Sequence, residues 1–106
     1  MLSEQDKKIF STFAGRIRRR FPEAKIWAFG SRTRGDASPE SDLDVCVVLD
    51  YLNDAVDTTV MEIAWETGFE NDIVISTVTY SRQEFEKGPC SESGLVHNIL
   101  DYGTTA

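Results

Sequence analysis

Two short apolar segments separated by a polar stretch limit the folds open to this chain more than any other feature. Lys25–Phe29 and Leu43–Leu49 read as buried strands. The first ends at Gly30-Ser31, and ten residues later Asp42-Leu43-Asp44 opens the second. Near-continuous apolar strands that alternate with helical patterns are typical of a sheet covered by helices. We therefore expect an α/β or α+β domain with a small mixed β-sheet flanked by helices.

The rest of the chain supplies helices around this pair of strands. Ser3 with Asp6 resembles an N-terminal cap, and Pro22 is expected to end the helix that follows. Its apolar positions recur at spacings of three and four residues, namely Phe10, Phe13, Ile17 and Phe21. Its basic end, Arg16 and Arg18 to Arg20, is expected to be solvated, although a partner contact stays open.

The C-terminal half continues the alternation of helices and strands. Asn53 or Asp54 is expected to cap a helix that closes at Gly68, and residues 72–78 are expected to form a third strand. The apolar stripe of that helix is Val56, Val60, Ile63, Ala64 and Thr67. A capping box at residues 81–84 opens a short helix, and a last helix ends at Gly103. Trp27 and Trp65 are expected in the core.

Length and charge restrict the classes of function. A chain of 106 residues suits one domain, so we expect residues 1–106 to form a single unit. The net charge of −7 argues against a nucleic-acid-binding face, which needs clustered positive charge. We expect no membrane segment, a cytoplasmic location, and structural roles for Cys46 and Cys90.

The paired acids Asp42 and Asp44 carry the chemical prediction. Alternation along a strand projects both carboxylates from one face, where two like charges repel each other. A divalent cation offsets such repulsion, and hard oxygen ligands favour Mg²⁺ or Mn²⁺. Gly30-Ser31 lies where a strand gives way to a turn, a place where backbone N–H groups suit a phosphate. The plainer alternatives are a polar turn that Ser41 caps and an ordinary helix N-terminus; Arg32 and Arg34 fit either phosphate clamps or a solvated loop.

With this Gly-Ser, ten-residue spacer and Asp-x-Asp order, the chain resembles the DNA polymerase β-like nucleotidyltransferases, in particular the minimal nucleotidyltransferases. The resemblance implies a polymerase-β-like palm in which Gly30 and Ser31, with Ser41, bind the nucleotide. It implies that Asp42 and Asp44 ligate two magnesium ions. Asp72 is the nearest match to the third catalytic and metal-binding carboxylate of the family, with Glu70 as a competitor.

The resemblance also implies a reaction and a partner. It implies transfer of AMP from ATP to a hydroxyl group, within a toxin–antitoxin pair whose toxin is a HEPN-domain RNase. Two alternatives stay open: an antitoxin that blocks its partner sterically without catalysis, and nucleotidyl transfer to a small molecule such as an aminoglycoside. The sequence does not decide whether the chain works in a homo- or hetero-oligomer.

Overall fold

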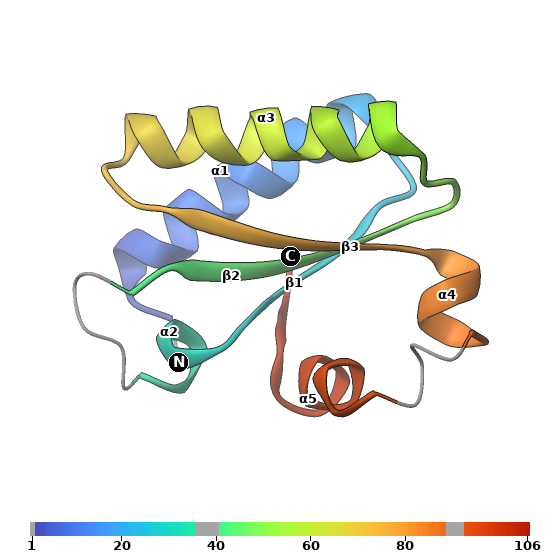
Figure 1. The fold of residues 1–106 in the computed structure, drawn as a ribbon. Helices are drawn as coiled ribbons and strands as arrows, with labels where there is room; N and C mark the ends of the chain where they lie inside the picture. The colour runs from blue at the N-terminus through green and yellow to red at the C-terminus, as the bar shows by residue number, and fades with distance from the viewer. Residues whose placement is uncertain (1, 36–40, 89–92) are drawn as a thin grey trace.

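A four-stranded mixed sheet forms the centre of the computed structural model, which describes residues 2–35, 41–88 and 93–106. The strands are β1 (Lys25–Phe29), β2 (Leu43–Leu49), β3 (Ile75–Ser81) and β4 (Thr104–Thr105), in the order β3-β2-β1-β4. β1 is antiparallel to β2 and β4, whereas β2 and β3 are parallel. The predicted mixed sheet flanked by helices is confirmed (Figure 1).

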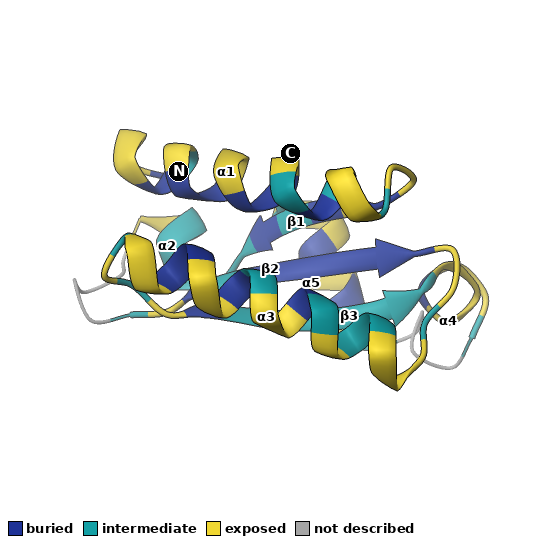
Figure 2. Cartoon of the chain, turned by 90° about the horizontal axis from the view of Figure 1, so that it is seen from above, coloured by how far each residue is buried: buried dark blue, intermediate teal, exposed yellow. Residues whose placement is uncertain are grey.

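Two long helices cover one face of the sheet, α1 (Glu4–Arg20) and α3 (Asp54–Glu70) (Figure 1). Ser3 caps α1 through a 3.0 Å bond from the Asp6 backbone N–H, and Asn53 caps α3 in the same way, as predicted. Figure 2 shows both helices with buried inner and exposed outer surfaces. Their inner sides and the sheet enclose the larger core, which includes Phe13, Ile17, Val45, Val47 and Val60.

The basic end of α1 is less solvated than the sequence predicts. Arg16 donates to the Thr67 hydroxyl at 3.0 Å and to the Glu70 carboxylate at 2.8 Å, so it joins α1 to α3. Arg18 donates to the carbonyl groups of Ala24 and Ala106. These contacts help to fix the position of α1, because Arg16 bonds α3 and Arg18 bonds Ala106, both distant in sequence.

The junction between α3 and β3 corrects two predictions. The helix passes through Gly68 and ends at Glu70, and β3 begins at Ile75 rather than at residue 72. Gly68 lies inside the helix because its bare Cα lets the chain return past it: a Cβ there would collide with the Ile73 carbonyl oxygen. Asp72 has a φ of 57°, a left-handed conformation that often follows a helix C-terminus. Asp72 therefore belongs to the turn and not to the strand.

Shorter elements cover the other face of the sheet: α4 (Arg82–Glu86), which begins at the predicted capping box, and α5 (Gly94–Tyr102), which ends at Gly103. They bury a second, smaller core of Cys46, Val48, Phe85, Val96 and Ile99. Burial raises the pKa of the Cys46 thiol to about 12, consistent with a structural role. Cys90 lies outside the described residues.

The two-residue strand β4, which pairs with Trp27 and Ala28 of β1, was not predicted from the sequence. Trp27 itself is half-buried and stacks on Phe85, with ring centroids 5.2 Å apart. No helix in the described ranges is both long and apolar enough to cross a bilayer.

Candidate active site

The two predicted metal ligands lie where β2 begins. Asp42 is exposed and immediately precedes β2, and Asp44 is half-buried in its second position. In the sheet, Asp44 is in register with Phe29 of β1 on one side and Ser76 of β3 on the other. The neighbouring Leu43 faces the core beneath α1 and α3, so strand alternation places Asp44 on the opposite face, with Cys46.

Gly30 connects this acidic pair to the end of β1. Its φ and ψ of 83° and −159° lie in a region that is essentially restricted to glycine. A Cβ on Gly30 would collide with a carboxylate oxygen of Asp44, so the backbone of the turn passes directly beside that carboxylate. The short helix α2 (Ser31–Arg34) follows at once, with Ser31 as its first residue. The structure thus brings the Gly30-Ser31 turn next to the Asp44 carboxylate.

The electrostatics of the pair fit a cation. Burial, with the charge of Asp42 as a second cause, raises the pKa of Asp44 above its ordinary value of 3.8, and Arg34 opposes this rise. A carboxylate that is costly to ionise next to another carboxylate gains from a neighbouring positive charge. Asp42 and Asp44 therefore have the donor chemistry for Mg²⁺ or Mn²⁺.

Arg32 is neither a phosphate clamp nor a member of a solvated loop in this structure, whereas both alternatives stay open for Arg34. Its Nη1 donates to both carboxylate oxygens of Asp6, at 3.0 and 3.1 Å, and its Nε donates to the Ser41 carbonyl at 2.8 Å. The side chains of Arg32 and Asp6 are only 13% and 8% exposed, so this is a nearly buried ion pair. Arg32 holds together the start of α1, α2 and the residue that precedes Asp42. The Ser41 backbone is thus held in place beside Asp42, and its predicted role in nucleotide binding stays a prediction.

The predicted third carboxylate does not join the pair. Asp72 lies exposed in the turn after α3, and Glu70 is bonded to Arg16. Within the described ranges, no three His, Cys, Asp or Glu side chains come close enough to hold one metal ion. β3 itself, with the sequence ISTVTYS, carries no acid, and Ser76 occupies the position beside Asp44.

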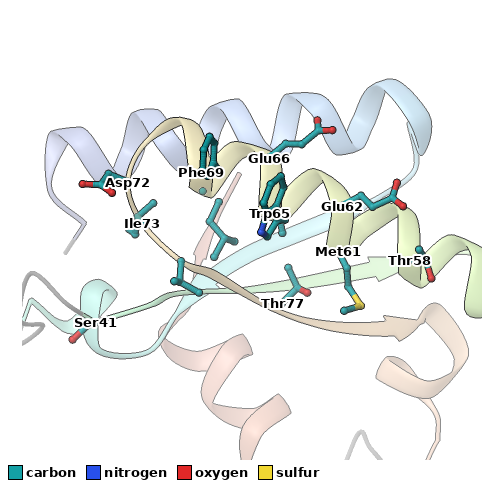
Figure 3. Close-up of a pocket in the computed structure, with 14 residues that line it drawn as sticks. Ser41, Thr58, Met61, Glu62, Trp65, Glu66, Phe69, Asp72, Ile73 and Thr77 are labelled. Atoms are coloured by element: carbon teal, nitrogen blue, oxygen red, sulfur yellow. The ribbon is translucent and has the colours of Figure 1, made fainter.

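A groove along α3 is the feature that sequence reasoning missed. It has a volume of about 1390 Å³ and lies between α3 and β3 (Figure 3). Trp65, expected in the core, is 68% exposed here and stacks on Phe69 with centroids 5.3 Å apart. The sequence does indicate this surface, because Met61, Trp65 and Phe69 recur every four residues and form a second apolar stripe beside the predicted core stripe.

Comparison with solved structures supports the fold. A mutant MntA–HpeT toxin–antitoxin, with two aspartates changed to glutamate, aligns with a TM-score of 0.59 and 19% identity, covering 97% of this chain and 72% of that chain. A toxin–antitoxin with AMP-PNP aligns with a TM-score of 0.58 and 19% identity, covering 88% and 68%. At these identities the likeness shows the fold alone. Curated proteins give no significant match.

Sequence comparison gives the family directly. The family described as nucleotidyltransferase domain matches residues 11–104, a range that includes the Gly-Ser turn, both aspartates and every strand but the final residue of β4. This chain therefore belongs to the nucleotidyltransferase domain family.

Proposed function

We propose that this domain transfers AMP from ATP, with Mg²⁺ or Mn²⁺, to a hydroxyl group of a partner protein. The observation that carries the proposal is the approach of the Gly30 backbone to the Asp44 carboxylate, with Ser31 opening α2 beside it. A phosphate-binding turn and a cation-binding pair need to be adjacent in order to hold a metal–nucleotide complex.

The reaction is an in-line displacement. The acceptor oxygen attacks the α-phosphorus, the bond from that phosphorus to the bridging oxygen breaks, and pyrophosphate leaves. Gly30 and Ser31 would bind the phosphates, and Asp42 and Asp44 would hold the metal, which supplies charge neutralisation. Asp72 remains our candidate to accept the hydroxyl proton, although the described structure keeps it in a turn outside the carboxylate pair.

A protein acceptor suits the charge of the chain. A net charge of −7 repels the phosphates of RNA or DNA and attracts a basic protein surface. Two solved structures of similar fold are toxin–antitoxins, which supports a toxin as the partner. We propose a HEPN-domain toxin encoded beside this chain.

Intact-mass spectrometry of the neighbouring gene product, after incubation with this chain and Mg·ATP, tests the proposal. We expect a mass gain equal to one AMP on that product, and none when Asp44→Asn replaces the wild-type chain. Transfer to RNA or an aminoglycoside instead of the protein would overturn it.

A second function, steric neutralisation without catalysis, is favoured by one observation. β3 carries no acidic residue next to the pair, so a third carboxylate is missing from the strand. If Asp44→Asn neutralises the partner as well as the wild-type chain does, with no AMP gained in either case, the steric function is the correct one.

A further inference from the structure

The groove along α3 combines exposed apolar side chains with uncompensated negative charge. Met61, Trp65, Phe69 and Val74 are 56%, 68%, 75% and 62% exposed, and all four line the groove. Isolated exposed apolar residues are ordinary on protein surfaces, but a contiguous set with two aromatic rings marks an interaction site. The volume of about 1390 Å³ exceeds the roughly 300–1,000 Å³ of small-molecule pockets, so a polypeptide segment fits it better.

The charge around the groove has one sign. Glu62, Glu66 and Asp72 line it, and no lysine or arginine does. These three acids form no ion pair within the part of the chain that the structure describes. The sequence extends the pattern, because from Gly35 to Ser81 it contains eleven aspartates and glutamates and no lysine or arginine. A second copy of this chain would bring like charges together across the groove, whereas a basic segment would be attracted.

The groove also leads to the candidate active site. Its lining runs along α3 to Asp72 and Ser41, the residue before Asp42, and Figure 3 shows Ser41 and Asp72 at the end away from Thr58. Val74 lies beside the start of β2, where its carbonyl accepts a 2.9 Å bond from the Leu43 N–H. β3 is the edge strand of the described sheet on this side, so a bound segment would pass around that edge to reach the carboxylates.

We propose that this groove docks the partner that receives the nucleotide, through a segment with an apolar centre flanked by lysine or arginine. This inference rests on the proposed function for the identity of the partner. Trp65 and Phe69 would supply the apolar anchor, and Glu62 and Glu66 would pair with the basic flanks. A partner docked here would continue past Ser41 and around the edge of the sheet, which would bring its acceptor hydroxyl to Asp42.

The test measures binding of the purified neighbouring gene product by isothermal titration calorimetry. Trp65→Ala should weaken binding by about 30-fold, the effect expected of a central aromatic anchor. The double substitution Glu62→Lys and Glu66→Lys should also weaken binding, because it removes the attraction to a basic segment. For the same reason, added salt should weaken the wild-type complex. Tyr102→Ala is the matched control, because Tyr102 is a 72% exposed aromatic residue on α5, across the sheet, and its loss should leave binding unchanged.

The outcomes separate this inference from the proposed function. If Trp65→Ala binds the partner like the wild-type chain and AMP transfer continues, the docking site is wrong and the proposed function stands. If Trp65→Ala weakens Mg·ATP binding instead, the groove serves the nucleotide base; if it abolishes a wild-type dimer, the occupant is a second copy. Either result overturns the inference. Absence of any complex with the wild-type chain overturns the inference together with the proposed partner.

Discussion

Replacement of Gly30 by alanine tests the central contact of the site, because this substitution adds one methyl group where the structure has no room. Backbone conformations restricted to glycine cost other residues about 1–3 kcal/mol. The new Cβ would also force the Asp44 carboxylate out of its position, and an off-rotamer side chain costs about 0.5–1.5 kcal/mol. The free energy of unfolding should therefore fall by about 1.5–4.5 kcal/mol. Since domains of this size lose roughly 4–8 °C of Tm per kcal/mol, a drop of about 6 °C or more is expected.

Urea denaturation of the metal-free protein, paired with an AMP-transfer assay, measures this effect, and two glycines serve as controls. Gly15→Ala should stabilise the chain by about 0.5–1 kcal/mol, because Gly15 is helical with open space around it. Gly35→Ala should carry the cost of a positive φ, here 82°, which is about 1–2 kcal/mol, at a glycine away from the Asp44 contact. Transfer should be lost in Gly30→Ala and retained in both controls.

A double-mutant cycle separates strain from collision. In an Asp44→Ala background the carboxylate is gone, so Gly30→Ala should cost only the backbone strain, and the coupling energy should be about 0.5–1.5 kcal/mol. A coupling near zero, or full transfer activity in Gly30→Ala, would refute the close approach of Gly30 to Asp44 as the basis of the site.

Four further outcomes are expected. Asp44→Asn should raise the free energy of unfolding at pH 7 in chelator. Because the folded pKa of Asp44 lies above 3.8, the wild-type chain should gain stability as pH falls through that pKa toward 3.8. The variant should lack this gain in parallel pH titrations. Mg²⁺ with ATP at 100 times its Kd should add about 2.7 kcal/mol in thermal melts, and ATP with chelator should add much less; equal shifts would argue against a metal-dependent site. Asp72→Asn should slow transfer by roughly 10²- to 10⁴-fold with Mg·ATP binding retained, whereas a dead Glu70→Gln beside an active Asp72→Asn would show that Glu70 is the third acid. Arg32→Met, which removes the charge that pairs with Asp6 and leaves that carboxylate alone, should cost about 3–5 kcal/mol in urea melts if the pair behaves as a buried one; a loss below about 1 kcal/mol would show a solvated pair.

The sequence predicted those parts of the fold that depend on local chemistry. Ser3, Asn53 and the capping box at Ser81 form the predicted helix starts, because each cap needs only residues within the same turn. The strands β1 and β2 were predicted at their observed bounds because their apolar runs end at the Gly30 turn and begin after Asp42. The close approach of Gly30 to Asp44 was not predicted, because it depends on how β1 and β2 pair in the sheet.

Features that depend on distant contacts were not predictable in this way. The start of β3 depends on how the chain leaves α3, where Ile73 donates to the Gly68 carbonyl and Asp72 takes the left-handed conformation. The pattern of residues 72–78 predicts a strand from local sequence alone, and it does not reveal the turn that Asp72 forms after α3. Likewise, the burial of Arg32 depends on Asp6, which is 26 residues away in the sequence, so Arg32 resembled a loop residue.

The residues whose environment was predicted wrongly share one location. Trp65 and Asp72 both line the groove at the edge of the sheet, where β3 has a strand neighbour on one side alone within the described structure. Predictions from sequence patterns assume that a domain buries its apolar side chains in its own core and pairs its charged side chains with its own residues. A surface that is completed by another molecule breaks that assumption, so a tryptophan stays exposed and acids stay unpaired. The residues whose environment was predicted wrongly thus lie on the surface along which, in our proposal, a partner would reach Asp42.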